Sequence, residues 1–144
     1  MNPTIFLTIF SGVTVYVLGQ IAVKLVIDPV QDFKKTIGQI SHYLIEYKNI
    51  IDNPGVGDND KICDASQHLR KLSSQLQAHL YLVPLYTITA STFRLPGKEQ
   101  ISIAGKALIG LSNSLHHASE NVYAGNSKDI DDICNSLNIY KDVS

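Results

Sequence analysis

The sequence predicts an all-α fold in which an N-terminal transmembrane helix is followed by a cytoplasmic helical bundle. Residues 4–23 form one uncharged and largely apolar run. In most of the remaining chain, large apolar residues recur at steps of three and four, which is the spacing of one face of a helix. Residues 85–93 are rich in threonine, but no second strand is available to pair with them, so no β-sheet is expected.

Length and composition limit the protein to one soluble domain. The chain has 144 residues and a net charge of −1. With residues 1–27 assigned to the transmembrane helix, residues 28–144 are long enough for one modest core and too short for two. Cys63 and Cys134 are isolated, without the spacing of a disulfide framework or of a thiol metal site. We expect both cysteines to be buried or half-buried in a reducing compartment.

The first helix is expected to cross a membrane. The uncharged run from Thr4 to Val23 spans a hydrocarbon core of about 30 Å at about 1.5 Å per residue. A secretory signal peptide is the competing interpretation, but no lysine or arginine precedes the run and no small-residue cleavage site follows it. Because Lys24, Lys34 and Lys35 follow the span, the positive-inside tendency places the N-terminus outside and the bundle in the cytoplasm.

The span has two unlike faces. At about 100° per residue, small and hydroxyl side chains gather within an arc of about 100°, opposite bulky apolar ones. Small residues let a neighbouring helix approach closely and hydroxyls can bond across, so this face predicts self-association. Gln20 is the costliest uncharged residue of the span and needs a partner or water. The candidate pore or helix-packing residues are Thr4, Thr8, Ser11, Gly12, Gly19 and Gln20.

Two alternatives stay open for this face. Hydroxyl groups that bond back to their own helix need no neighbouring helix. A single span conducts ions only by assembling with copies of itself, and an inert oligomeric anchor uses the same small residues for packing alone. The sequence does not separate a pore from an anchor.

The soluble part begins with a strong helical pattern. Asp28-Pro29 predicts either a new helix, with an aspartate cap and a proline at the first position, or a kink in a continuing helix. Turn-forming residues at 52–60 end the pattern. Its expected core residues are Val30, Phe33, Ile37, Ile40, Leu44, Tyr47 and Ile51.

Further helices are expected to complete the bundle. Residues 61–82 predict a third helix, and residues 85–93 predict a short helix or an extended connection. Ser127 is expected to cap a last short helix. The apolar faces expected to pack together are Ile62, Ala65, Leu69, Leu72, Leu76 and Leu80 in the third helix, Ile101, Ala104, Leu108, Leu111, Leu115, Ala118 and Val122 in the fourth, and Ile130, Ile133 and Leu137 in the last.

The sequence carries no catalytic signature, and we expect neither an enzyme nor a bound cofactor or metal. It contains no phosphate-binding glycine loop, nucleophile elbow or zinc motif. Residues 55–60 lack the length and closing glutamate of a calcium loop. His116 and His117 are adjacent on the predicted fourth helix and point about 100° apart, so they do not share one ion.

Residues 65–118 form a cationic block with a net charge of +4. Such a block attracts anions, and Tyr81 and Tyr86 are close enough in sequence to offer stacking surfaces. A nucleotide or a short single-stranded DNA is the expected kind of ligand. The plainer interpretation is that the block packs against the acidic blocks on either side of it. The candidate anion-binding or oligonucleotide-binding residues are Arg70, Lys71, Arg94, Lys98 and Lys106.

The stretch "GQIAVKLVIDPVQDFKKTIGQISHYLIEYKNII" at 19–51, followed by "LRKLSSQL" and "ALIGLSNSL", resembles small bacterial proteins with one N-terminal membrane helix and a helical cytoplasmic domain. Some proteins of this build are membrane effectors of anti-phage defence, including the Hailong type, in which a nucleotidyltransferase makes DNA oligomers that restrain a channel-like effector. The resemblance implies an oligomeric inner-membrane channel that depolarises the membrane when released. The alternative is a non-conducting, membrane-anchored adaptor that presents its bundle to a cytoplasmic protein.

Overall fold

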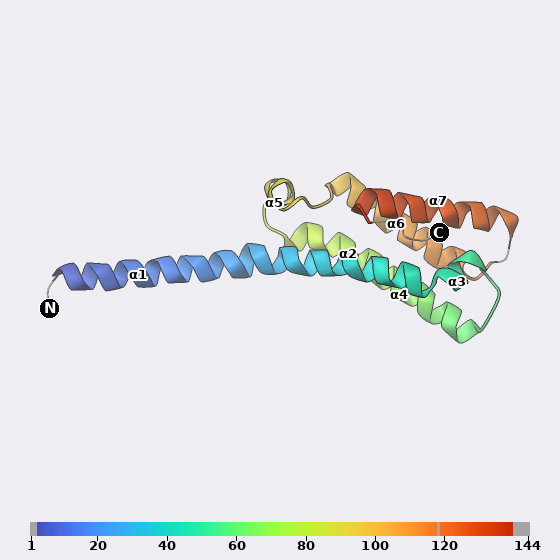
Figure 1. Ribbon diagram of the computed structural model, residues 1–144, viewed down its shortest axis with the longest axis horizontal. Helices are drawn as coiled ribbons and strands as arrows, with labels where there is room; N and C mark the ends of the chain where they lie inside the picture. The colour runs from blue at the N-terminus through green and yellow to red at the C-terminus, as the bar shows by residue number, and fades with distance from the viewer. Residues whose placement is uncertain (1–2, 118, 140–144) are drawn as a thin grey trace.

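The computed structural model describes residues 3–117 and 119–139, which are helical with no strand. This confirms the all-α prediction. Figure 1 shows one long rod whose second half lies within a bundle of shorter helices, while the first half projects away from it. The elements are α1 (Pro3–Ala22), the π-helical segment η1 (Val23–Ile27), α2 (Asp28–Glu46), α3 (Lys48–Asp52), α4 (Asn59–Leu82), α5 (Tyr86–Phe93), α6 (Lys98–Ser114) and α7 (Glu120–Leu137).

The rod is a single helix from α1 to α2, so Asp28 does not cap a new helix. Its backbone is helical, with φ −59° and ψ −50°, and the second of the two interpretations of Asp28-Pro29 is correct. Proline lacks an N–H, and its ring clashes with the carbonyl four residues earlier in a regular helix. The wider turn of η1, in which the Asp28 N–H bonds to the Val23 carbonyl, accommodates this proline without ending the helix.

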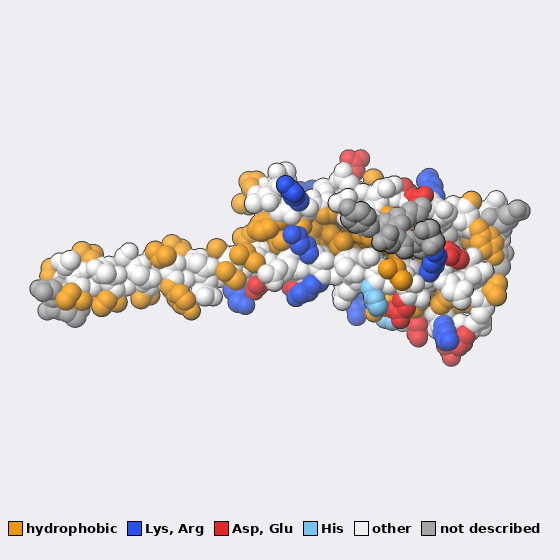
Figure 2. Space-filling model, viewed as in Figure 1, with side chains coloured by type: hydrophobic (Ala, Val, Ile, Leu, Met, Phe, Trp, Pro, Cys, Tyr) orange, Lys and Arg blue, Asp and Glu red, His pale blue; other side chains and the backbone are white. Residues whose placement is uncertain are grey.

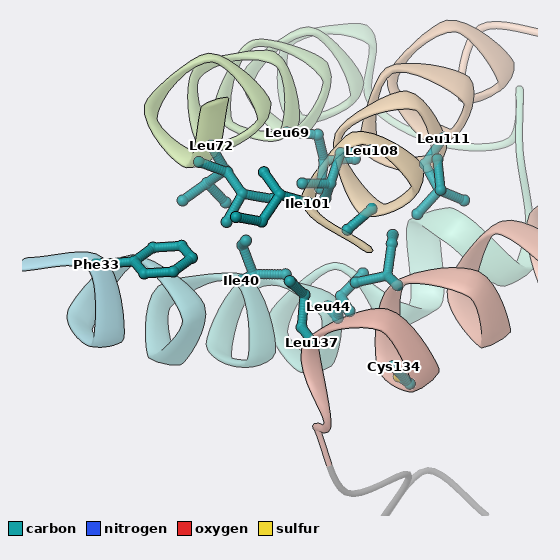
Figure 3. Close-up of a cluster of buried hydrophobic side chains, with 14 of the residues drawn as sticks. Phe33, Ile40, Leu44, Leu69, Leu72, Ile101, Leu108, Leu111, Cys134 and Leu137 are labelled. Atoms are coloured by element: carbon teal, nitrogen blue, oxygen red, sulfur yellow. The ribbon is translucent and has the colours of Figure 1, made fainter. Parts of the chain in front are cut away.

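The core lies between α2, α4, α6 and α7 (Figure 3). Phe33 and Ile40 of α2 are completely buried, and they meet completely buried leucines of α4 and α6. The predicted seam faces the core, although Ile37 and Tyr47 are only partly buried. The single helix predicted to carry it is interrupted at Tyr47, so Ile51 lies in α3. The residues drawn and labelled in the core view are Phe33, Ile40, Leu44, Leu69, Leu72, Ile101, Leu108, Leu111, Cys134 and Leu137.

Small residues bring α4 and α6 into close contact. The Ser66 hydroxyl donates to the Ser112 carbonyl, and the Ser112 hydroxyl donates back to the Ser66 carbonyl, each over 3.0 Å. Farther along the same contact, the Ser73 hydroxyl donates to the Gly105 carbonyl over 2.8 Å. Each buried hydroxyl therefore has a partner, which offsets the cost of removing it from water.

The end of the bundle differs from the sequence prediction. The fourth helix ends at Ser114, and the last helix begins at Glu120, so Ser127 lies inside α7 and the prediction that it caps a helix is wrong. Val122 belongs to α7, and Ala118 lies outside the described residues. Apolar residues continue at helical spacing across the turn between the two helices. The turn contains no proline or glycine that would predict a helix end.

Residues 85–93, which the sequence leaves open between helix and extended chain, form the short helix α5. Leu85 precedes it and Arg94 follows it, both in the left-handed backbone region with φ 47° and 54°. The Tyr86 hydroxyl donates to the Pro96 carbonyl over 2.6 Å. Figure 1 shows that α5 lies at the end of the bundle from which α1 projects.

Candidate functional site

The helix α1 is exposed along its whole length, with no buried residue from Pro3 to Ala22. It continues into α2 as one helix of 44 residues, and by length and composition this is the one helix, among the described residues, that is able to cross a membrane. Its first charged residue is Lys24. A long, uncharged and largely apolar helix that packs against nothing in its own chain is typical of a helix with a non-aqueous surrounding.

The candidate face of α1 carries one hydroxyl with a partner in its own helix and two glycines that contact no other part of the chain. The Thr8 hydroxyl donates to the Thr4 carbonyl over 2.9 Å, so it bonds back to its own helix. Around Gly12 and Gly19, a Cβ atom would meet nothing within 4 Å. A glycine inside a helix costs about 0.5–1 kcal/mol relative to alanine, and no contact within the chain requires either one.

The remaining two candidate residues, Ser11 and Gln20, lie on different sides of α1. Ser11 and Gln20 are both exposed. On a regular helix Gln20 points about 100° away from Gly19, since each residue turns the helix by that angle. Gln20 therefore does not continue the strip of small residues, and it faces the side that carries Val13 and Val17.

The five candidate cations do not gather at one place. Arg70 of α4 is used within the bundle, because its Nε donates to the Ser112 hydroxyl over 2.9 Å and its Nη2 donates to Asn113. Ser112 lies fourteen positions after Lys98 on α6, which is about 21 Å along the helix axis. Arg70 and Lys98 therefore do not serve one small ligand. Lys71 and Lys106 are exposed on α4 and α6.

Arg94 has a neighbour that the sequence did not single out. Together with Lys34 it lines a pocket of about 230 Å³, and no carboxylate is among the lining residues. The other lining residues come from α2, the α5–α6 connection and the end of α7: Ile37, Leu95, Pro96, Ser136, Leu137 and Asn138. Only the tertiary fold places Lys34 beside Arg94, since sixty positions separate them. In Figure 2, Lys and Arg side chains lie around the narrow part where the rod meets the bundle.

The two candidate stacking tyrosines differ in accessibility. Tyr81 is 90% exposed, whereas Tyr86 is only 5% exposed, so the prediction of a stacking surface is wrong for Tyr86. A different group of aromatic rings lies between α2 and α4. Tyr43 stacks on Tyr47 and on His68, with ring centroids 5.5 Å and 4.9 Å apart. The spacing of Tyr43 and Tyr47 by four positions on a predicted helix is the signal that identifies two of these three rings.

His79 is the one buried side chain, among the described residues, with a nitrogen that lacks a hydrogen-bond partner. Its Nε2 lies 2.9 Å from the Thr36 hydroxyl, and its Nδ1 is the atom without a partner. Its ring lies 5.1 Å from that of Phe33. Burial lowers the pKa of His79, and the nearby carboxylate of Asp32 opposes this shift in part. The imidazole therefore favours its neutral form.

Exposed ion pairs border the junction of α1 and α2. Lys24 pairs with Asp28 and Lys35 pairs with Asp32, in both cases over 3.0 Å. Such exposed pairs contribute about 0–1 kcal/mol each. They neutralise Lys24 and Lys35, whereas Lys34 forms no ion pair with the described residues.

No three histidine, cysteine or acidic side chains within residues 3–117 and 119–139 are placed to hold a metal ion. Cys134 is buried as expected, but Cys63 is exposed on α4, so the prediction of burial is wrong for Cys63. Its place one position after the buried Ile62 directs it away from the core. No protein-family model, curated protein or solved structure matches this chain.

Proposed function

We propose that the protein is a single-pass protein of the bacterial inner membrane that self-associates through α1, conducts ions and depolarises the membrane as an effector of anti-phage defence. The N-terminus lies outside and the bundle lies in the cytoplasm, because lysines follow the span. The observation that carries the proposal is the form of α1, an uncharged helix that is exposed throughout and continues unbroken into the bundle core.

The unbroken helix gives the bundle a direct mechanical connection to the span. The α2 half buries Phe33 and Ile40 completely, so it moves with the bundle. Backbone hydrogen bonding continues through η1, where the Asp28 N–H bonds to the Val23 carbonyl. A tilt or rotation of the bundle is therefore transmitted to α1, which is what a channel controlled by its cytoplasmic domain requires.

The unused space at Gly12 and Gly19 supports self-association. Seven positions separate them, so they lie on nearly the same side of the helix, about 20° apart. A neighbouring copy of α1 that packs on this side occupies the space that is empty in the single chain. Thr4 and Ser11 lie beside the same strip.

Membrane potential in bacteria that express the full chain tests the proposal. We expect the wild type to depolarise the membrane, Gly12→Leu to abolish depolarisation, and Val13→Leu to retain it. Leucine at position 12 fills the space needed for close approach, whereas Val13 is exposed and points about 100° away. Both changes keep the span apolar, and membrane fractionation checks that the variants are inserted equally.

An intact potential with the wild type at the same membrane level contradicts the pore and favours the adaptor. One observation favours this second function: the Thr8 hydroxyl already bonds to the Thr4 carbonyl and so contributes little to a polar pore lining. An adaptor displays its bundle instead, and the stacked Tyr43, Tyr47 and His68 provide an aromatic surface for a cytoplasmic protein.

The proposal includes control by a nucleotide or a short single-stranded DNA at the pocket of Lys34 and Arg94. Two cations without a carboxylate among the lining residues match a phosphate group. The pocket is adjacent to α2, so an occupant bears on the helix that continues into the span. A volume of about 230 Å³ holds a sugar-phosphate unit rather than a whole oligonucleotide.

Binding of a fluorescent single-stranded DNA of about ten nucleotides to the full chain in detergent tests this control. We expect Arg94→Glu to weaken binding at least ten-fold, since it replaces an attraction with a repulsion. Lys71→Glu is the matched control, because it reverses an exposed cation of α4 that is not among the lining residues of the pocket. Equal weakening by both variants indicates attraction by net charge alone and contradicts the pocket as the site.

A further inference from the structure

A second apolar surface lies at the end of the bundle from which α1 projects. Four large side chains of α4, α5 and their connection are exposed there: 90% for Tyr81, 61% for Leu82, 77% for Leu85 and 66% for Ile88. We call these four residues the α5 patch. They belong to an uncharged stretch, residues 80–93. Several large apolar side chains exposed together mark a surface that has a partner.

Packing contacts hold the α5 patch beside the first turns of α2. The ring of Tyr86, which follows Leu85, lies 6.2 Å from that of Phe33. Leu82 lines one groove together with Asp32 and other residues of α2. Figure 1 agrees, since α5 lies beside the junction where the rod leaves the bundle. The patch and the base of α1 are therefore at the same end of the molecule.

The dimensions of a bilayer place this end in the headgroup layer. The twenty residues of α1 span about 30 Å, which equals the thickness of the hydrocarbon core. Lys24 and the turn that follows it then lie among the headgroups. Figure 1 shows α5 beside the start of α2, just after this turn. The patch therefore faces the cytoplasmic side of the same layer.

Charge around the patch fits lipid phosphates. Lys98 lines a pocket together with residues of α5, and no carboxylate is among the lining residues. Asp28 and Asp32, the acidic residues at the start of α2, are paired with lysines. Basic side chains next to an apolar surface bind the anionic headgroup layer while the apolar side chains enter it.

We infer that the α5 patch inserts into the interfacial layer of the bilayer that α1 crosses, so that the bundle is held to the membrane at two places. The inference rests on α1 crossing the membrane, as the proposed function requires. Leu85 is exposed and has a left-handed backbone conformation, which costs free energy in a residue other than glycine. The hydroxyls of Thr89 and Thr92 donate to backbone carbonyls of Pro84 and Ile88, so lipid contact leaves neither unpaired.

Lipid quenching of a fluorophore on the full chain in liposomes tests the inference. Cys63→Ser removes the exposed cysteine, and Leu85→Cys then carries an environment-sensitive NBD label. Lipids brominated near the headgroup are the quenchers. Val56→Cys is the matched control, because Val56 is also an exposed apolar residue but lies in the loop before α4. Val13→Cys reports whether α1 is in the bilayer.

We expect the label at position 85 to be quenched at least two-fold more strongly than at position 56, together with quenching at position 13 by deeper bromines. Quenching at 13 but not at 85 overturns the inference and leaves the span intact. A blue shift at 85 without quenching shows that protein covers the patch and also overturns it. An absence of quenching at position 13 shows that α1 does not cross the bilayer, which contradicts both the proposed function and this inference. Quenching at 85 in a protein that conducts no ions supports the inference while the pore fails.

A charge in the patch provides a second measurement. Leu85→Asp, with the label moved to Ile88→Cys, is expected to lower quenching at position 88 to the level of position 56, because a carboxylate resists transfer into the interface. Val56→Asp with the same label is the control and is expected to leave the quenching unchanged. Unchanged quenching in the Leu85→Asp variant contradicts insertion at the patch.

Discussion

The two halves of one continuous helix have opposite surroundings. In α1 no residue is buried, although the helix is rich in large apolar side chains. In α2 apolar residues appear at a regular spacing, and those on one side, such as Phe33 and Ile40, are completely buried by α4, α6 and α7. The apolar side of α2 is covered by its own chain, and the apolar residues of α1 are not covered by it.

This difference teaches how to interpret apolar residues on a helix. A periodic pattern with polar residues between the apolar ones limits the contact to one side, which a protein core provides. A long uncharged helix with apolar residues on most of its sides has no such limit, and it has the length and composition of a helix that is able to cross a bilayer. Because Pro29 is accommodated by η1 rather than ending the helix, the two environments join without a flexible linker.

Deletion of core volume is expected to have the largest effect and to separate the two halves most clearly. Leu108 of α6 is completely buried in the core, so Leu108→Ala is expected to lower the free energy of unfolding by about 2–5 kcal/mol. Leu18 of α1 is 60% exposed, and Leu18→Ala is expected to leave the free energy of unfolding of the bundle within about 0.5 kcal/mol.

Urea unfolding of the full chain in detergent micelles, followed by tyrosine fluorescence, measures both variants. The contrast between α1 and α2 requires that α2 packs into a core within its own chain. A small decrease in the free energy of unfolding with Leu108→Ala contradicts such a core. A large loss with Leu18→Ala shows instead that α1 packs against the bundle, which contradicts the separation of the two halves.

The sequence was sufficient for the part of the fold that periodicity encodes. The burial of Phe33, Ile40 and Leu44 follows from spacing within one helix, and spacing is local information. The predicted boundary between α6 and α7 was wrong. Apolar residues continue at helical spacing through the turn between them, and the turn contains no glycine or proline. A helix end is determined by backbone hydrogen bonding and capping as well as by which residues are apolar.

The candidate ligand site could be predicted only in part, because it depends on how helices pair. Arg94 was a candidate as a cation of the block at 65–118, but its neighbour Lys34 comes from α2 and is placed there only by the fold. Arg70 has the same chemistry in sequence, yet the register of α4 on α6 brings it to Ser112 and Asn113. Composition identifies the charges, and packing decides which of them are available to a ligand.

Acidification is expected to have a smaller effect, and it acts where α4 meets the start of α2. The folded protein keeps His79 neutral, since burial lowers its pKa below the ordinary value of 6.5. The unfolded chain binds a proton near that ordinary pKa. Above pH 6.5 both states are neutral at this residue and its full contribution to stability is present. As the pH falls below 6.5 the unfolded state binds more protons, so the free energy of unfolding decreases.

Unfolding of the full chain between pH 7.5 and 5.5 measures this dependence, with His79→Gln as the comparison. Glutamine offers a donor toward the Thr36 hydroxyl and does not titrate, so we expect the free energy of unfolding to fall less steeply with acidification in the variant than in the wild type. Asp32 and Lys35 line the same groove and are present in both proteins. Their contributions to the pH dependence therefore cancel in the comparison. Equal slopes show that another group dominates the pH dependence. A steeper slope in the wild type locates a proton-sensitive contact where the core begins, next to the half of the helix that has no partner in its own chain.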